Sequence, residues 1–354
     1  MNRPLTLKRV AFAVVANLLA FSVLSAIGEL ATRWYMEGSV SAALRSFVTS
    51  QASDDATRVS GWLVSDADLG YKLNPASAGV NSLGIRHDEI ADVKPDGLFR
   101  VIVLGDSVAW GEDGFVKLLR DRFNRVHYGP VEVINAAIPG YTTYQERTLL
   151  ERDLLRHRPD LVILQYCLND HHRFLHMLNE TGRWLVTPDA ERVLVPQGQG
   201  PLTTLMRSSY LLLELRLRLF ALMPRSVTQF PWETDHNVAP AWQDHTWSDF
   251  EAHVQAMRDS LARLDARFAV VAVPLESQLQ QTFLDRDADY TLKPQRTLAE
   301  ICRRLSVPFL DLHPVFVSNR KLSLYKDGLH LKPAGHELMA EHILAFLERD
   351  KLAN

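Results

Sequence analysis

The residues best suited to chemistry begin at Ser107. An apolar run over residues 101–104 stops at Gly105 and leads through Asp106 into this serine. A short β-branched run predicts a buried strand, and a glycine after it permits a sharp turn. Open α/β sheets place their sites at the carboxyl ends of their strands. Ser107 is therefore a candidate nucleophile, although a strand followed by a turn is also ordinary chain geometry.

A serine hydroxyl is a weak nucleophile, so it needs a base, and the base needs an orienting acceptor on its other nitrogen. Asp327 and His330 lie three residues apart, just before a helix predicted over residues 333–349. Histidine suits the role of base because its ordinary pKa is near neutrality. The same spacing in isolation fits a capping aspartate beside a surface histidine, so the assignment depends on Ser107.

Two further strand ends offer hydrogen-bond donors. The predicted strand over residues 131–135 leads into the turn Pro139-Gly140, and the strand over residues 161–166 runs into Asn169. Acyl transfer from a serine needs donors aimed at the oxygen that becomes negative. The backbone N–H of Gly140 and the side-chain amide of Asn169 are candidates, and each also fits a plain turn after a strand.

Together, these blocks resemble the SGNH (GDSL-type) hydrolase family in their order: Gly105-Asp106-Ser107, Gly140, Asn169-Asp170 and Asp327-x-x-His330. The resemblance covers roughly residues 95–348, apart from much of an insertion. It implies a flavodoxin-like, three-layer α/β/α fold around a five-stranded parallel sheet, with no cofactor and no metal. The catalytic residues that it implies are Ser107 as nucleophile, His330 as base and Asp327 as its orienting partner. The implied oxyanion hole consists of the N–H groups of Ser107 and Gly140 and the amide of Asn169.

One position departs from the family pattern, because Cys167 stands where Gly-x-Asn-Asp would have glycine. This puts the local backbone at residue 167 in question. The α/β-hydrolase alternative fits less well, since its nucleophile elbow Gly-x-Ser-x-Gly would need glycine in place of Ala109. The segment Gly84-Ile85-Arg86, together with an apolar N-terminus, is similar to membrane-tethered members of cell-surface polysaccharide systems.

The elements that must position these residues alternate between strand and helix. Strands are predicted over residues 100–104, 131–135, 161–166, 269–273 and 307–310, and helices over 114–123, 144–157, 249–264, 295–304 and 333–349. Short apolar strands separated by helices predict a parallel sheet covered on both faces. Residues 61–99 are rich in turn formers and predict an irregular segment laid against this domain.

The alternation is interrupted once, by an insertion over about residues 172–267. It contains a leucine-rich stretch over residues 208–223, which predicts a helix packed on the main domain or a lid. It also contains Trp232, Trp242 and Trp247. Core packing is the commoner use of such residues, and stacking on sugar rings is the alternative.

The N-terminus is predicted to lie outside the globular domain. Residues 1–9 are basic, 10–28 form an apolar membrane anchor, 29–60 a juxtamembrane stalk, and 61–354 the SGNH hydrolase-like domain. Basic residues on the N-terminal side favour a cytoplasmic N-terminus and an extracytoplasmic, for instance periplasmic, catalytic domain. A cleaved signal peptide with secretion is the alternative.

Composition narrows the class of protein. Apolar residues make up 47% and charged residues 23% of the 354 residues, and the net charge is −3 with no long basic block. These values are ordinary for a globular protein and indicate no nucleic-acid partner. The two cysteines, Cys167 and Cys302, exclude a disulfide framework and favour two separate buried thiols.

The first functional hypothesis is a serine esterase that removes acyl groups, acetyl above all, from a cell-envelope or exported polysaccharide. The partner is then an acylated carbohydrate or another ester. An O-acetyltransferase that acylates a glycan through the same residues is the second hypothesis, since a sugar hydroxyl replaces water. The third is a non-catalytic glycan-binding or assembly component, against which the intact set of candidate residues argues.

Overall fold

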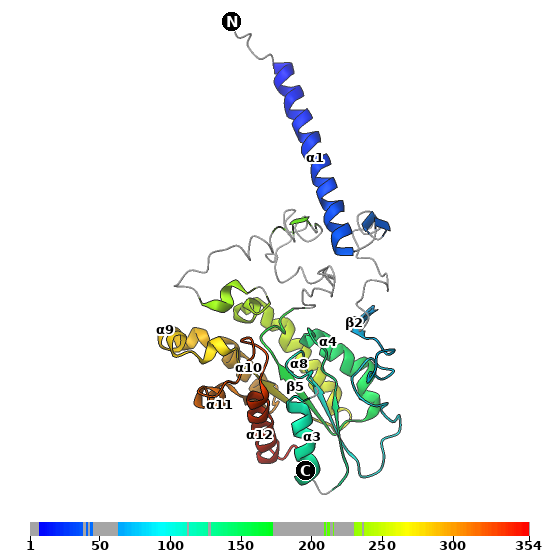
Figure 1. The fold of residues 1–354 in the computed structure, drawn as a ribbon, viewed down its shortest axis with the longest axis vertical. Coiled ribbons are helices and arrows are strands. Elements are labelled where there is room, and N and C mark those ends of the chain that lie inside the picture. Colours follow the sequence, from blue (N-terminus) through cyan, green and yellow to red (C-terminus); the bar gives the residue numbers. More distant parts are fainter. Residues whose placement is uncertain are drawn as a thin grey trace.

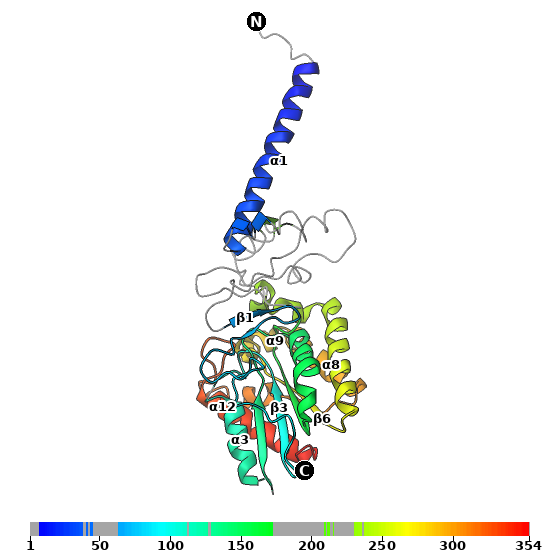
Figure 2. The ribbon, with the colours of Figure 1, turned by 90° about the vertical axis from the view of Figure 1, so that its right-hand side faces the viewer.

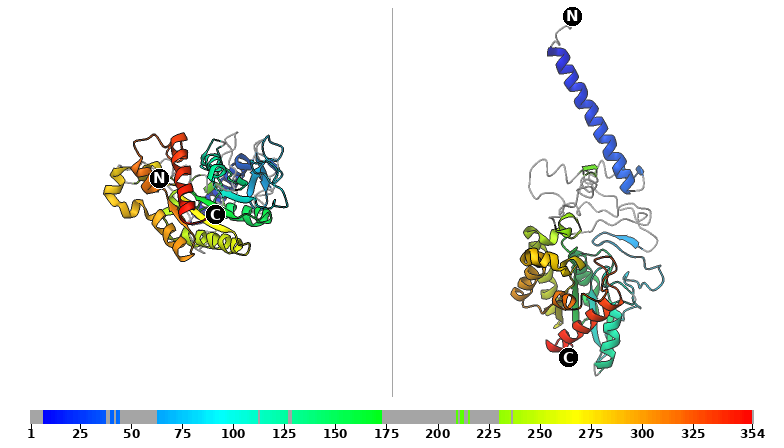
Figure 3. Two further views of the ribbon diagram at one scale, coloured as in Figure 1. Left: turned by 90° about the horizontal axis from the view of Figure 1, so that it is seen from below. Right: turned by 60° about the vertical axis from the view of Figure 1, so that its left-hand side comes forward.

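The computed structural model describes residues 7–37, 40–41, 43–44, 63–111, 113–126, 129–172, 209, 211–212, 215, 230–235 and 237–353. The predicted stalk beyond residue 44 and most of the leucine-rich stretch at 208–223 lie outside this set. The helix α1 (Leu7–Glu37) projects from the domain (Figures 1 and 3).

The central sheet is parallel and five-stranded, which confirms the predicted fold class. Its order is β4 (Val131–Asn135), β3 (Phe99–Leu104), β5 (Leu161–Tyr166), β6 (Arg267–Ala272) and β7 (Phe309–Asp311). Two strands match their predicted bounds, and the other three differ by one to two residues at an end. The strand β5 is buried along its whole length and β3 is buried from Arg100 onward, as expected for strands covered on both faces.

Helices cover both faces of the sheet because successive residues of each strand point to opposite sides. Ile102 and Leu104 face one core, and Val101 and Val103 face the other. The first core is closed by α4 (Thr143–Leu149), α8 (Trp247–Ala262) and α10 (Lys293–Arg304). The second is closed by α3 (Phe115–Val126), α11 (His313–Ser318) and α12 (Pro333–Arg349). Figure 2 shows α3 and α12 on one side of β3 and α8 on the other.

The helix predicted over residues 144–157 is divided in three. It begins as α4, continues as the π-helical turn η2 (Leu150–Leu154) and ends as the 3-10 turn η3 (Leu155–His157). The helix α9 (Gln281–Thr291) and the short α11 were not predicted. Their local apolar pattern is short, so tertiary contacts rather than sequence periodicity define them.

Residues 61–99 contain structure where an irregular segment was expected. The strands β1 (Leu63–Asp66) and β2 (Gly70–Leu73) form an antiparallel hairpin. It lies against the domain as predicted: the Tyr71 hydroxyl donates to the Pro139 carbonyl at 2.8 Å, and the Tyr141 hydroxyl donates to the Tyr71 carbonyl at 2.7 Å. The hairpin therefore supports the turn that contains Gly140.

The described part of the insertion belongs to the core. Three 3-10 turns, η5 (Pro231–Thr234), η6 (Ala239–Trp242) and η7 (Asp244–Thr246), lead into α8. Trp232 and Trp242 stack at 4.8 Å between ring centroids, and both are buried, as is Trp247. These tryptophans pack in the protein interior, where each large buried side chain contributes about 1.5–3 kcal/mol. Cys167 and Cys302 are two free buried thiols, as predicted.

The N-terminal helix carries a candidate membrane span. By length and composition, residues 14–35 are long and apolar enough to cross a bilayer. Its apolar side chains are exposed, for example Phe21 and Leu24. Near its C-terminal end, Glu29 forms an ion pair with Arg33 at 2.8 Å and accepts a hydrogen bond from the Ser209 hydroxyl at 2.7 Å. The insertion therefore contacts this helix.

Candidate active site

The turn after β3 is shaped by a lack of space for a side chain. A Cβ atom on Gly105 would lie 2.6 Å from Gln165 Oε1 and 3.0 Å from Ala109 Cβ, so glycine fits here without displacing a neighbour. The turn then closes through a hydrogen bond from the Ala109 N–H to the Asp106 carbonyl at 3.2 Å. The Val108 N–H donates to Asp106 Oδ1 at 2.9 Å. Ser107 is thereby held at the carboxyl end of the strand.

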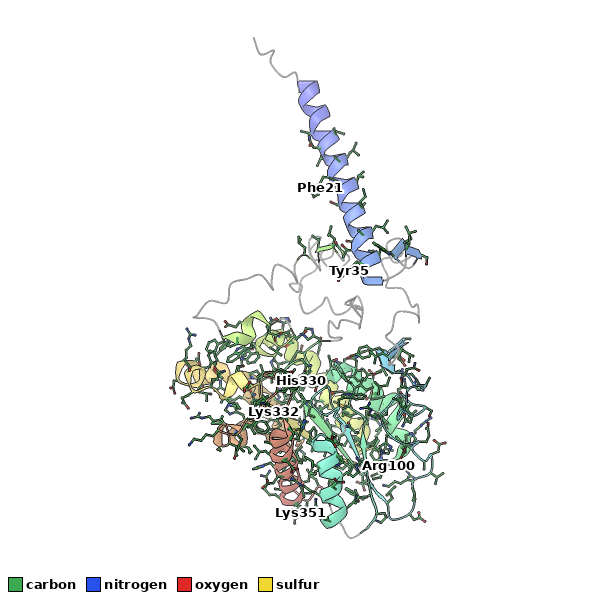
Figure 4. The ribbon with its side chains drawn as sticks, in the orientation of Figure 1. Phe21, Tyr35, Arg100, His330, Lys332 and Lys351 are labelled. Carbon is green, nitrogen blue, oxygen red and sulfur yellow. The ribbon has the colours of Figure 1, made fainter. Side chains whose placement is uncertain are left out.

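The C-terminal loop brings a histidine to this serine across 223 residues of sequence. His330 Nε2 lies 2.8 Å from Ser107 Oγ, and His330 Nδ1 lies 2.8 Å from Asp327 Oδ2. The loop is closed at its base, where Lys326 donates its N–H to the His330 carbonyl at 2.7 Å. Figure 4 places His330 in the part of the domain nearer α1, away from Arg100 at the start of β3.

Asp327 is both a capping residue and a partner of the histidine ring. It accepts hydrogen bonds from the backbone N–H groups of His330 at 2.9 Å and Leu329 at 3.3 Å. Partial burial opposes ionisation, but these bonds and the one from the His330 ring lower the pKa of Asp327 below its usual value. The side chains of His330 and Asp327 are 39% and 49% exposed, so the pair is accessible from solvent.

The turn containing Gly140 runs beside the serine turn. Beyond β4, Ala136 donates its N–H to the Val103 carbonyl at 2.9 Å, and Ile138 donates to the Gly105 carbonyl at 3.1 Å. Gly140 then adopts a φ of 76°, a conformation that favours glycine. Within the described part of the chain, neither the Ser107 N–H nor the Gly140 N–H has a protein acceptor. Both donors are therefore available to a ligand.

Asn169 is tied to the residue before the serine. Its Nδ2 donates to Asp106 Oδ2 at 3.0 Å, and both side chains are buried. An amide nitrogen carries two hydrogens, so one donor remains after this bond. Asn169 thus lies at the same edge of the sheet as Ser107, as its place after β5 predicted.

The departure from the family pattern at Cys167 has a simple structural outcome. Cys167 does not adopt a positive φ, so its backbone does not require glycine. Its N–H donates to Asp170 Oδ2 at 3.0 Å, and the Asp170 N–H donates to the Cys167 carbonyl at 3.1 Å. This closed turn fixes the segment that carries Asn169.

Three acidic residues near the site, Asp106, Glu146 and Asp170, were given no role from sequence. Burial raises the pKa of Asp106. Burial also raises the pKa of Glu146 well above the usual value, and the nearby carboxylates of Asp170 and Asp106 raise it further. Burial likewise raises the pKa of Asp170, with Asp106 adding to the shift. Neither carboxyl oxygen of Glu146 has a hydrogen-bond partner in the described part of the chain. The sequence feature that could have indicated Glu146 is its spacing. It lies three residues after Thr143 and three before Leu149, so all three residues share the buried face of α4.

Among the residues with described placement, no three His, Cys, Asp or Glu side chains gather as a metal ion would require.

The fold and the Ser107–His330–Asp327 contact define an α/β/α protein with the groups needed for ester hydrolysis. Residues 103–338, more than half of the chain, match the GDSL-like Lipase/Acylhydrolase family. The chain belongs to this family and is an ester-hydrolysing enzyme. The match extends from β3 into α12 and includes all three residues of the contact.

Solved structures with similarity to the chain include a variant of Axe2, an acetyl-xylooligosaccharide esterase from Geobacillus stearothermophilus. It is 15% identical with a TM-score of 0.45, covering 70% of this chain and 94% of that one. TesA is 15% identical with a TM-score of 0.42, covering 71% and 98%. The lipase/acylhydrolase from Enterococcus faecalis is 15% identical with a TM-score of 0.43, covering 71% and 96%. No curated protein sequence matches the chain.

Proposed function

We propose that this enzyme is a serine esterase that removes acyl groups, acetyl above all, from a cell-envelope or exported polysaccharide. The observation that carries the proposal is the continuous contact from Ser107 Oγ to His330 Nε2 at 2.8 Å and from His330 Nδ1 to Asp327 Oδ2 at 2.8 Å. This order of hydroxyl, imidazole and carboxylate is the arrangement that activates a serine.

In the first half of the reaction, Ser107 Oγ attacks the ester carbonyl carbon while its proton passes to His330 Nε2. Asp327 remains a carboxylate and stabilises the imidazolium of His330. This agrees with the lowered pKa of Asp327, because its hydrogen bonds outweigh its partial burial. The carbonyl oxygen becomes an oxyanion that accepts the N–H groups of Ser107 and Gly140. The Asn169 Nδ2 hydrogen not bound to Asp106 is the third donor.

Collapse of the intermediate breaks the ester bond. The departing sugar oxygen takes the proton from His330 and leaves as an alcohol, and the acyl group stays on Ser107. A water molecule then loses a proton to His330 and attacks the acyl carbon. Ser107 recovers the proton from His330, and the carboxylic acid leaves. No other reactant is needed.

The location of the reaction follows from the N-terminus. Exposed apolar side chains along α1, such as Leu18 and Phe21, favour a helix placed in a membrane. The basic residues Arg3, Lys8 and Arg9 precede the apolar span of this helix at residues 14–35, which favours a cytoplasmic N-terminus. We therefore place the catalytic domain outside the cytoplasm, where cell-envelope glycans are found; a cleaved signal peptide would give a secreted enzyme instead.

The proposal is tested with the full chain purified in detergent and p-nitrophenyl acetate as substrate. Ser107→Ala should lower kcat by several orders of magnitude because the acyl-enzyme cannot form. The control is Ser318→Ala, which removes a serine hydroxyl that donates to the Pro314 carbonyl of its own helix. Equal rates for Ser107→Ala and the unmodified enzyme would refute the mechanism.

Hydrolysis is separated from transfer by product analysis. The enzyme is given the acetyl donor with and without an oligosaccharide acceptor, and the products are separated by mass. Acetate alone supports the esterase, whereas acetylated oligosaccharide supports the transferase. If neither product forms and a serine-directed phosphonate does not label Ser107, the non-catalytic alternative holds.

A further inference from the structure

A pocket of about 300 Å³ with both charged and apolar lining residues lies beside the serine turn. Three segments contribute its charged and aromatic lining. Arg86 and His87 come from the segment before β3, Trp110 from the turn that carries Ser107, and Lys117 and Arg120 from α3. The rest of the described lining consists of Gly111, Asp113, Val116 of α3, and Val133 and Asn135 of β4.

The described lining of the pocket has an excess of positive charge. Among the lining residues that the structure describes, Arg86, Lys117 and Arg120 stand against one carboxylate, Asp113. Lys117 also lies 3.6 Å from Asp121, but both side chains are nearly half exposed. An exposed pair of this kind is weak, so Lys117 can turn to another anion at small cost. The protein as a whole carries a net charge of −3, so this excess is local.

Arg86 is held in a defined orientation. Its guanidinium lies 4.5 Å from the centre of the Trp110 ring, and its side chain is partly buried. Stacking on an aromatic face restricts a guanidinium to a plane and leaves its N–H edge directed sideways. Such an edge matches the two oxygens of a carboxylate or phosphate.

The pocket is within reach of the reacting serine. Trp110 follows Ser107 by three residues, and three peptide units span at most about 11 Å. A glycan whose acyl ester lies at Ser107 therefore has a neighbouring sugar unit close to Trp110 and Arg86. The segment that carries Arg86 and His87 and the helix α3 form the two walls beside that unit.

We propose that this pocket binds an anionic group, carboxylate or phosphate, on a sugar unit next to the acylated one, so that the substrate is an acidic glycan. Arg86 is the main specificity residue, and Lys117 and Arg120 add positive charge from α3. The proposal rests on the esterase function above and specifies its substrate class.

The test compares the full chain with two variants, Arg86→Ala and the double variant Lys117→Gln with Arg120→Gln. Three acetylated oligosaccharides of matched acetyl content are offered: an oligouronate, a phosphate-bearing glycan and a neutral xylo-oligosaccharide. Arg125→Gln, on the same helix but outside the pocket, controls for the change in net charge. Hydrolysis of p-nitrophenyl acetate reports whether the reacting groups remain intact.

Loss of Arg86 should raise KM for at least one anionic substrate about tenfold, the effect of losing about 1.4 kcal/mol of a charge-assisted hydrogen bond. KM for the neutral substrate and the rate with p-nitrophenyl acetate should stay unchanged. The anionic substrate that responds identifies the group as carboxylate or phosphate. Added salt should raise KM for that substrate alone.

Equal KM values for the anionic and neutral substrates in the unmodified enzyme would overturn the inference while leaving the esterase function intact. So would an Arg125→Gln effect as large as that of Arg86→Ala. Failure of the esterase function itself is distinguishable, because it would show first as p-nitrophenyl acetate hydrolysis that does not depend on Ser107.

Discussion

Asn169 Nδ2 donates a hydrogen bond to Asp106 Oδ2 at 3.0 Å. Asp106, which directly precedes Ser107, therefore orients the side-chain amide of Asn169. Both side chains are buried, and the other oxygen of Asp106 accepts the Val108 N–H at 2.9 Å. One carboxyl group thus connects the turn of Ser107 to the third proposed oxyanion donor. This connection makes Asp106 a positioning residue in our interpretation.

Asp106→Ala should lower kcat about 10²-fold with little change in KM, comparable to the loss of one oxyanion donor. The reason is that the Asn169 amide loses the partner that fixes its direction. Asn169→Ala should have a similar effect. Steady-state kinetics of both variants and of the double variant provide the measurement, and the double variant should be scarcely worse than either one. Fully additive effects would show that the two residues act independently.

Glu146 should make stability dependent on pH. Burial and the nearby carboxylates raise its pKa above the usual 4.5, so the folded state keeps a proton that the unfolded state releases. The contribution of Glu146 to folding stability is therefore greatest below pH 4.5, and it falls as the pH rises toward the raised pKa of this group. Glu146→Gln cannot ionise, so its melting temperature should drop less than that of the unmodified enzyme between pH 5 and pH 8.

The control for this measurement is Glu348→Gln, on the exposed side of α12. It should follow the pH profile of the unmodified enzyme. Each proton held only by the folded state changes stability by about 1.4 kcal/mol per pH unit, which is measurable by thermal unfolding. Parallel curves for Glu146→Gln and the unmodified enzyme would mean that Glu146 does not hold a proton in the folded state.

Asp327→Asn should lower kcat by about 10⁴-fold, because an amide no longer stabilises the imidazolium of His330. In the unmodified enzyme, partial burial of Asp327 is outweighed by its hydrogen bonds, which lower its pKa. Asp327 therefore stays ionised above pH 3.8. Its contribution is therefore present at higher pH and is lost only as pH falls below that value. The rate with p-nitrophenyl acetate at pH 8, where Asp327 is ionised, tests the effect on kcat, with Asp350→Asn as a control at an exposed ion pair.

Gly105→Ala should destabilise the domain by about 1–3 kcal/mol, the usual cost of an added methyl group in a packed site. The new Cβ would lie 2.6 Å from Gln165 Oε1, so the Gln165 side chain must move. Combining Gly105→Ala with Gln165→Ala should restore part of the melting temperature. If the single variant melts like the unmodified enzyme, the turn tolerates a side chain after all.

Much of the fold follows from local patterns in the sequence. The strands at residues 131–135 and 161–166 have the predicted bounds, because a continuous apolar run between turn residues has few other conformations. The helix over residues 333–349 also begins at its proline and ends as predicted. The hairpin of β1 and β2 was missed, since four-residue strands carry almost no periodic signal and depend on contacts such as that of Tyr71 with Pro139.

The sequence by itself placed Ser107, Gly140 and Asn169 after strands and Asp327 and His330 before the last helix, and the order of these residues proposed them as one group. Only the tertiary structure decided their contacts, because the 2.8 Å approach of His330 to Ser107 joins segments 223 residues apart. It alone also brought Glu146 near Asp170 and Asp106, and Arg86 onto Trp110. Strand and turn preferences act over a few residues, whereas such contacts depend on how whole layers pack.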